Sequence, residues 1–174
     1  MIVPLPTRSK RTDRPGRWDE WRAQESRLVC KANAEGEVPM SDSIQRFDPP
    51  DLKTPVRGFH TTIRTEGLVF LAGMTGRSAD GEVVEGFDAQ TTAAFERIRE
   101  GLALAGAEAA DVVQLMFFLV AHEERSFAQD FGVVMAAKEA VLPGCAPVGT
   151  AVRVSELFDP RLFIEIQAVA RAKD

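Results

Sequence analysis

Residues 111–121, DVVQLMFFLVA, are the segment that most constrains the fold. The segment is almost wholly apolar and rich in β-branched and aromatic side chains. Such a run favours a β-strand that is covered on both faces, because a strand with one face in water alternates apolar and polar residues. Whatever fold the chain adopts must therefore cover both faces of the sheet that holds this strand.

Further strands are predicted on either side of this segment. Residues 59–73, FHTTIRTEGLVFLAG, indicate two strands around a turn at Glu66 and Gly67. Near the end of the chain, residues 148–155 (VGTAVRVS) and 162–171 (LFIEIQAVAR) indicate two more.

Two amphipathic helices are expected between these strands. Residues 87–107 have apolar positions at helical spacing, with Asp88 as candidate N-cap and Gly106 as the stop. Residues 126–144 predict the second helix, with Ser126 as its N-cap. The element order is ββαβαββ, an α+β fold in which a mixed sheet carries two helices on one face. No further segment is left for the other face, so a symmetric homo-oligomer is expected to cover it.

The first 39 residues differ from the rest of the chain. They are rich in charge, Pro and Gly and have little apolar periodicity, which is typical of a flexible N-terminal arm. A short helix over residues 18–28 that packs on a neighbour is the alternative. Met40 is a plausible natural start, so residues 40–174 are expected to form the single folded domain.

Composition narrows the classes of function. No window approaches the ~18 apolar residues of a membrane span and no apolar signal region begins the chain, so a cytoplasmic protein without a membrane partner is expected. Residues 40–174 carry thirteen basic against twenty acidic residues, which argues against nucleic acid as the main partner. Two cysteines, Cys30 and Cys145, and two histidines indicate neither a disulfide framework nor a metal site, and no cofactor motif is present.

Several motifs occur together in one order. GLVFLAGMTG, the block from DGEVVEGFDAQ to LMFFLV, the AP before residue 148 and the closing LFIEIQAVA resemble the YjgF/Rid family over residues 55–171. The resemblance implies a chorismate-mutase-like fold assembled as a homotrimer, with an active site in each cleft between subunits. Family members that are imine deaminases hydrolyse 2-imino and enamine acids to 2-oxo acids and ammonia. This chemistry needs a cation for the substrate carboxylate, a positioned water and an acid/base group.

The resemblance assigns roles to residues of the closing strand. Glu165 stands where the family has its water-orienting glutamate, and Gln167 replaces the second acid of the usual pattern. Between Ile164 and Ile166, an acid must face a polar cleft or be paired. Pairing with an arginine at a subunit contact is the alternative interpretation of Glu165.

At the first strand the family has a tyrosine, and this chain has Phe59. Without a hydroxyl, Phe59 can provide only an aromatic wall. His60 supplies a general base if the register shifts by one residue, and a structural histidine is the alternative.

At the start of the fourth strand the family has an arginine that grips the substrate carboxylate, and this chain has Gly149. A charged hydrogen bond contributes about 1.5–3 kcal/mol, and glycine replaces none of it. Backbone donors around Gly73, Gly149, Thr150 and Ala151 are predicted to hold a neutral carbonyl or a smaller anion instead. The missing side chain also leaves room for a bulkier substrate.

Other residues are candidates to replace the arginine or to supply reactive groups at the site. Arg153 has the same strand parity as Gly149 but lies about 13 Å along the strand, so an ion pair is the alternative for it. Arg57 and Arg64, near the first strand, are weaker candidates. Cys145 is a candidate nucleophile near the cleft mouth, with a small buried residue as the alternative.

The sequence therefore predicts a Rid-like trimer that hydrolyses an imine, enamine or related C=N substrate without the arginine clamp. Glu165 would activate water, and no metal or cofactor would take part. A trimer that binds a metabolite or partner without catalysis is the alternative. A mutase-like reaction is suggested by the fold alone.

Overall fold

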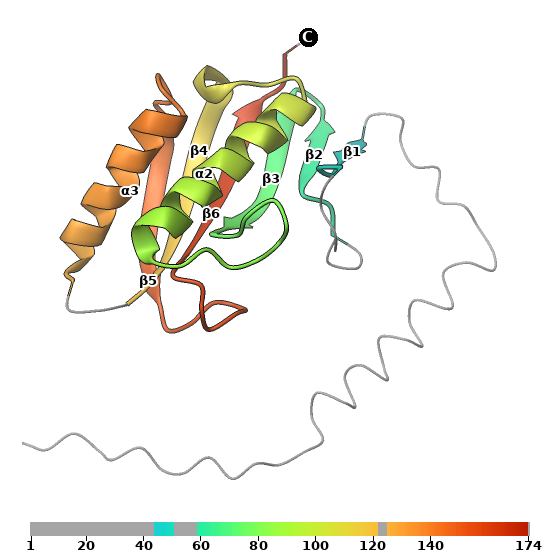
Figure 1. Ribbon diagram of the computed structural model, residues 1–174. Coiled ribbons are helices and arrows are strands. Elements are labelled where there is room, and N and C mark those ends of the chain that lie inside the picture. Colours follow the sequence, from blue (N-terminus) through green and yellow to red (C-terminus); the bar gives the residue numbers. More distant parts are fainter. Residues whose placement is uncertain (1–43, 51–58, 122–124, 174) are drawn as a thin grey trace, which may run out of the picture. The chain divides into compact units, whose positions relative to one another are not determined.

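The computed structural model (Figure 1) describes residues 44–50, 59–121 and 125–173. The predicted arm and its alternative helix lie outside these residues. The elements, in chain order, are strands β1 (Gln45–Phe47), β2 (Thr62–Thr65) and β3 (Leu68–Thr75), helix α2 (Phe87–Leu104), the 3₁₀ turn η1 (Ala109–Asp111), strand β4 (Val112–Val120), helix α3 (Phe127–Val141), and strands β5 (Val148–Val154) and β6 (Ile164–Arg171).

The strands form one mixed sheet in the order β1-β2-β3-β6-β4-β5. β4 and β5 are parallel and every other neighbouring pair is antiparallel. Both helices lie on the same face of this sheet (Figure 1). The predicted mixed sheet with two helices on one face is confirmed. Strand β1 was not predicted, because three residues are too few to show a period.

The first hairpin turns where the sequence predicted. Glu66 and Gly67 both have positive φ, 43° and 80°. Two consecutive left-handed residues match the right-handed twist of the flanking strands. The turn therefore fixes the register of β2 against β3, in which Thr65 pairs with Leu68.

Helix α2 begins differently from the prediction. Its N-cap is Gly86 at φ 84°, and no side chain caps it. Asp88 lies inside the first turn, where a carboxylate is favoured by the helix dipole, and it accepts hydrogen bonds from Arg125 at 2.8 and 2.9 Å. The helix ends as expected at Gly106, which has φ 74° and donates to the Ala103 carbonyl.

Helix α3 begins at the predicted cap. The Ser126 hydroxyl accepts from the Gln129 backbone N–H at 3.3 Å, and the Gln129 side chain accepts from the Ser126 N–H at 2.8 Å. Only two residues of α3, Asp130 and Val134, are fully buried, whereas α2 buries eight. Helix α3 is therefore the less deeply packed of the two.

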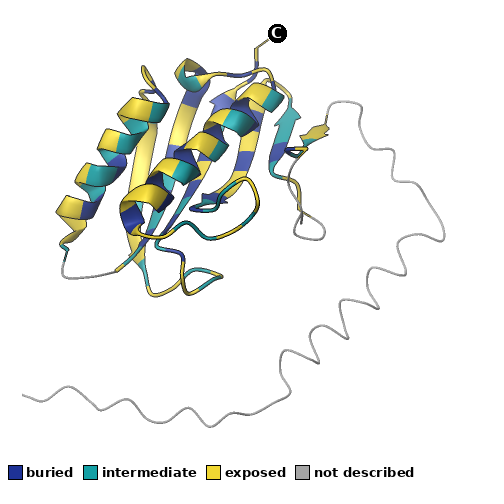
Figure 2. Cartoon of the chain, in the orientation of Figure 1, coloured by how far each residue is buried: buried dark blue, intermediate teal, exposed yellow. Residues whose placement is uncertain are grey.

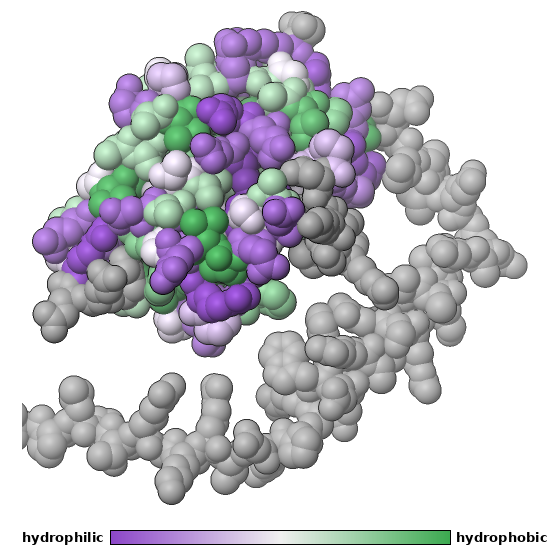
Figure 3. Space-filling model, in the orientation of Figure 1, coloured by the Kyte–Doolittle hydropathy of each residue, from purple (hydrophilic) through white to green (hydrophobic). Residues whose placement is uncertain are grey.

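The core lies between the helices and the sheet. On β6 burial alternates, and Ile164, Ile166, Ala168 and Ala170 face the helices. In Figure 2 the buried residues of α2 lie on its side toward the sheet. On the outer surface of the helical layer, hydrophilic and apolar side chains are interspersed (Figure 3).

The opposite face of the sheet is covered by no described element, and we call it the open face. It is apolar in several places: Leu68, Phe70 and Val152 are 38, 40 and 40% exposed. Met116 and Phe118 of β4 also point there, since their neighbours Leu115, Phe117 and Leu119 face the helices. The homotrimer predicted to cover this face stays a prediction. Among the described helices, none has the length and apolar composition of a membrane span.

The buried side chain of Gln90 on α2 binds two loops at one end of the sheet. One loop connects β3 to α2 and the other connects β5 to β6. Gln90 is 1% exposed; its amide nitrogen donates to the Val84 and Arg161 carbonyls at 2.9 and 2.8 Å, and its oxygen accepts from the Phe163 N–H at 2.8 Å. Both loops are therefore fixed to α2, and the second leads directly into β6.

We expect Gln90→Leu to lower the free energy of unfolding by about 2–4 kcal/mol, because it leaves three backbone groups without their partner. Urea denaturation of the full chain at fixed protein concentration measures this. Glu96→Ala, an exposed position on the same helix, is the control and should change stability by less than about 0.5 kcal/mol. Equal effects of the two substitutions would contradict the role assigned to Gln90.

Candidate functional site

Glu165 lies on the central strand of the sheet and faces away from the helices. In β6 it stands between the buried Ile164 and Ile166, so its side chain points to the open face. It pairs with Thr75 of β3 on one side and with Phe118 of β4 on the other. The carboxyl group is thus held by a strand with neighbours on both edges.

Gly73 provides the space that the Glu165 side chain occupies. A β-bulge interrupts the pairing of β3 with β6 between Leu71 and Met74. A Cβ atom built on Gly73 would lie 1.7 Å from Oε1 of Glu165. Only glycine at this position therefore admits the carboxyl group in its observed place.

The electrostatic setting of Glu165 is unusual for a carboxylate. Burial raises its pKa above the ordinary value of 4.5. Within the described part of the chain, no side chain or backbone group forms a hydrogen bond or ion pair with the carboxyl group of Glu165. Pairing with an arginine at a subunit contact, the alternative interpretation of Glu165, involves a second chain and stays a prediction. A half-buried carboxyl without a partner can exchange a proton with a bound water or substrate.

Two other predicted residues share the open face with Glu165. Gln167 follows on the same side of β6 and is exposed. Thr150 of β5 pairs with Met116 of β4, which in turn pairs with Gln167. Thr150, Met116 and Gln167 therefore lie in one row across the sheet.

Gly149 and Ala151 lie on the other face. They pair with Leu115 and Phe117 of β4, whose side chains are in the core, so they point toward α3. A cavity of about 460 Å³ opens between α3 and β5. Its lining residues are Phe117, Phe131, Met135, Lys138, Glu139, Gly144, Cys145, Ala146, Pro147, Gly149 and Ala151.

The predicted site residues are therefore divided between the two faces of the sheet. Glu165 and Gly73 are on the open face, and Gly149 and Ala151 are on the helical face of an edge strand. Strand β4 separates β6 from β5, which puts their axes about 10 Å apart. Within one chain, the carboxyl of Glu165 and the α-carbon of Gly149 do not open into the same space.

Arg153 is engaged by α3. Its guanidinium forms an ion pair with the buried Asp130 at 2.7 Å and lies 5.8 Å from the centre of the Phe127 ring. The ion pair considered as an alternative for Arg153 is thus present. Arg64 donates to the carbonyls of Ala105, at 3.2 Å, and Lys173. Arg57 lies outside the described residues.

Phe59 and His60 precede β2, which lies near the edge of the sheet opposite to β5. Phe59 is 71% exposed, and Nδ1 of His60 lies 2.8 Å from the Asp48 carboxylate. Burial alone would raise the pKa of Asp48, but hydrogen bonds from the Thr61 backbone and from His60 hold it below its ordinary value. Asp48 was not identified from the sequence, because its partners are 12 and 13 residues away in a loop without a period.

Cys145 lies in the wall of the cavity beside α3. It is 2% exposed with a free thiol, and burial raises its pKa, which disfavours the nucleophilic thiolate. The backbone carbonyl of Cys145 accepts a hydrogen bond from Lys138. Its surroundings match the small buried residue considered as the alternative. No three His, Cys, Asp or Glu side chains of the described chain are gathered as metal ligands.

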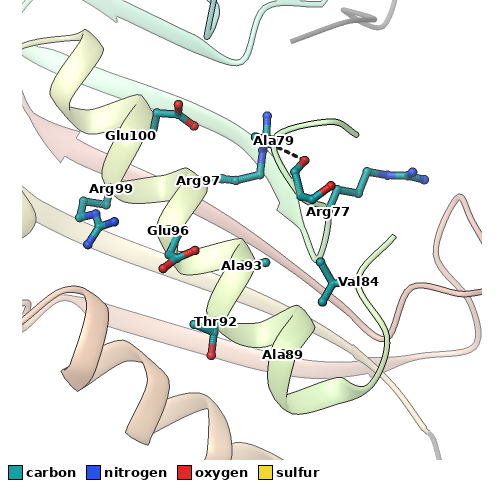
Figure 4. Close-up of a pocket in the computed structure, with 11 residues that line it drawn as sticks. Arg77, Ala79, Val84, Ala89, Thr92, Ala93, Glu96, Arg97, Arg99 and Glu100 are labelled. Carbon is teal, nitrogen blue, oxygen red and sulfur yellow. Dashed lines mark hydrogen bonds between the residues drawn. The ribbon is translucent and has the colours of Figure 1, made fainter. Parts of the chain in front are cut away.

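A larger hollow of about 830 Å³ lies between α2 and the loop over residues 77–84 (Figure 4). Its guanidinium groups are partly engaged: Arg97 donates to the Ser78 carbonyl at 3.1 Å, and Arg77 pairs with Asp159 at 2.8 Å. None of the residues predicted for the site lines it. We therefore place the candidate site on the open face and at β5.

Comparison with known proteins agrees with this fold. The family model described as endoribonuclease L-PSP matches residues 52–172. The chain belongs to this family, which is the YjgF/Rid family. The resemblance inferred from the sequence motifs is thereby confirmed. A search of the curated proteins finds no match.

Solved structures of this family are similar over the whole domain. A member of the YjgF/YER057c/UK114 family from Mycobacterium tuberculosis is 27% identical with a TM-score of 0.61, covering 75% of this chain and 100% of that one. RidA from an Antarctic Psychrobacter is 25% identical with a TM-score of 0.64, covering 73% and 98%. A Thermotoga maritima protein described as a putative endoribonuclease is 22% identical with a TM-score of 0.63, covering 75% and 99%, and shows the fold alone.

We expect Glu165→Gln to raise stability at neutral pH. Because burial raises the pKa of Glu165, the folded protein binds its proton more tightly than the unfolded chain does. Ionisation therefore destabilises the fold as pH rises from about 4.5 through the folded pKa. The glutamine variant does not ionise and so does not lose this stability. The difference in free energy of unfolding between variant and parent should be complete above the folded pKa and absent below pH 4.5.

Urea denaturation between pH 4 and pH 8 at one protein concentration measures the difference. Glu96→Gln on the exposed face of α2 is the matched control, with an expected change below about 0.5 kcal/mol. A glutamine variant that is less stable than the parent at pH 8 would contradict the environment assigned to Glu165.

Proposed function

We propose that this protein is a Rid-family hydrolase of small imines, enamines or related C=N compounds, acting in a cleft between subunits of a homotrimer. The observation that carries the proposal is Glu165, a half-buried carboxyl without a partner in the described chain, above a glycine that leaves it room. An acid with a raised pKa suits proton transfer near neutral pH.

The proposed reaction adds water across the C=N bond. Glu165 accepts a proton from the water as its oxygen bonds to the imine carbon, and the protonated carboxyl then gives that proton to the nitrogen. Collapse of the resulting amino alcohol releases ammonia and leaves a carbonyl compound. Atoms balance with one water consumed, and no metal or cofactor is required.

Two copies of the chain are needed for one site in this proposal. Glu165 and Gly73 face the open side, while the backbone from Gly149 to Ala151 belongs to an edge strand whose described pairing is with β4 alone. A second copy that covers the apolar open face with its β5 edge would bring the two groups together. Backbone N–H groups of that edge would then polarise the substrate.

The replaced arginine limits the substrate class. Gly149 offers no cation, and Arg153 is committed to Asp130, so a substrate carboxylate has no strong partner at β5. The proposal therefore excludes ordinary 2-imino acids as the best substrates. RNA is not favoured as a substrate either, since the chain carries a net charge of −5.

Gly149 and Phe59 also favour a second candidate function, binding without catalysis. Gly149 and the hydroxyl-free Phe59 together remove two groups that the family resemblance assigns to catalysis. A trimer that binds a metabolite or partner without turnover would need neither of them. Turnover separates the two candidates.

We expect the purified protein to hydrolyse neutral imines generated in situ by an amine oxidase, and Glu165→Gln to lower kcat/KM by about 100-fold or more. Release of ammonia measures the rate. Gln167→Glu, on the same face, is the control and should retain most of the activity.

A loss of activity has to be distinguished from a loss of the trimer. Light scattering should give a trimer for the parent and for both variants, because none of the substitutions changes the apolar residues of the open face. Saturable ligand binding without turnover across the imine panel would support the second candidate. A monomeric parent protein would contradict the shared cleft.

The Gly149→Arg variant should gain activity on 2-iminobutyrate. A Cβ at this position meets its nearest atoms, the Leu115 carbonyl and the Phe117 ring, at 3.6 Å, which is ordinary van der Waals contact, and the adjoining cavity provides space for a longer side chain. A restored guanidinium is expected to raise kcat/KM by about 10- to 100-fold, mainly through KM. Gly149→Met, of similar length but neutral, is the control. Equal rates for both variants would show that the absence of an arginine at residue 149 is not what limits activity on 2-iminobutyrate.

A further inference from the structure

The cavity beside Gly149 is an open hollow with a largely apolar wall. Its volume of about 460 Å³ is within the range of small-molecule sites. Phe117, Phe131 and Met135 supply its larger side chains, and Gly149 and Ala151 form the strand side. The rings of Phe117 and Phe131 are perpendicular, with centres 5.8 Å apart.

The hollow follows from two features of this sequence. Helix α3 buries only Asp130 and Val134 completely, so its aromatic residues are partly exposed toward β5. Gly149 and Ala151 are too small to fill the gap from the strand. A longer side chain at Gly149 would start 3.6 Å from the Phe117 ring and extend into this space.

The charged groups at the cavity do not favour an anion. The Lys138 ammonium donates to the Cys145 carbonyl and lies 3.6 Å from the Glu139 carboxylate, so its charge is already compensated. A carboxylate entering the cavity would meet aromatic rings, Glu139 and a Lys138 ammonium that is already engaged. A neutral apolar group would instead be desolvated against the rings and the methionine.

We propose that this cavity binds an aryl or branched alkyl substituent of a neutral substrate, and so selects imines of bulky apolar ketones and aldehydes. The inference rests on the proposed function, since the cavity lies beside the strand that would border the shared cleft. The space beside Gly149, where the family resemblance implies an arginine, is then part of the substrate site.

Binding of the ketone product tests the inference without requiring turnover. The probes are 4-phenylbutan-2-one and acetone, added to full-length protein labelled at its methionine methyl groups. Met135 lines the cavity and Met116 lies on the open face, so the two methyl signals in NMR spectra report separate places. We expect the aryl ketone to shift the Met135 signal, leave Met116 unchanged, and bind at least about tenfold tighter than acetone.

A pair of glycine substitutions provides the matched control. Gly149→Leu fills the cavity and should weaken binding of the aryl ketone by about tenfold or more. Gly132→Leu introduces the same side chain on α3 where nothing lies within 4 Å, and should leave binding unchanged. Thermal unfolding of both variants verifies that they are folded.

The outcomes separate this inference from the proposed function. Shifts at Met116 alone, equal affinity for both ketones, or equal binding by the two leucine variants would overturn the cavity assignment even if imines are hydrolysed. Tight aryl ketone binding at Met135 with no turnover of any imine would retain the apolar site and overturn the hydrolase. Turnover that favours the imine of 4-phenylbutan-2-one, reduced in Gly149→Leu and not in Gly132→Leu, supports both.

Discussion

The pairing of β6 between β3 and β4 is the interaction on which the rest of the structure depends. Strand β6 lies between β3 and β4, so the sheet is continuous only when β6 is in place. One side of β6 supplies Ile164, Ile166, Ala168 and Ala170 to the core. Its other side carries Glu165 to the open face. Because the strand is paired on both edges, the backbone of Glu165 is fixed although its carboxyl group has no partner among the described residues.

One-sided burial connects this strand to assembly. The helices cover one face and leave an apolar surface around Leu68, Phe70 and Val152 on the other. An apolar sheet face of this kind is stabilised by a second copy more readily than by water. The division of Glu165 and Gly149 between the two faces gives the same surface a chemical meaning, since a site containing both requires more than one chain.

In the proposed function, a few atoms at the edge strand β5 set the choice of substrate. With glycine in place of arginine, β5 offers backbone groups and a hollow bordered by Phe117, Phe131 and Met135. Arg153 on the same strand cannot replace that arginine, because its guanidinium is held by the buried Asp130. In the site that we propose, the loss of one charge and the gain of apolar space both disfavour carboxylates and favour bulky neutral groups.

The sequence by itself determined the order of the elements from β2 to β6, the Glu66–Gly67 turn, the Ser126 cap and the family, because periodicity, turn chemistry and motif order are local properties of the chain. It placed the cap of α2 at Asp88 rather than Gly86 and missed β1 and the Asp48–His60 contact. Only the tertiary structure decided these points, and only it showed that Glu165 and Gly149 face opposite sides of the sheet. Those features depend on strand register and on contacts between residues distant in the chain, which local patterns do not encode.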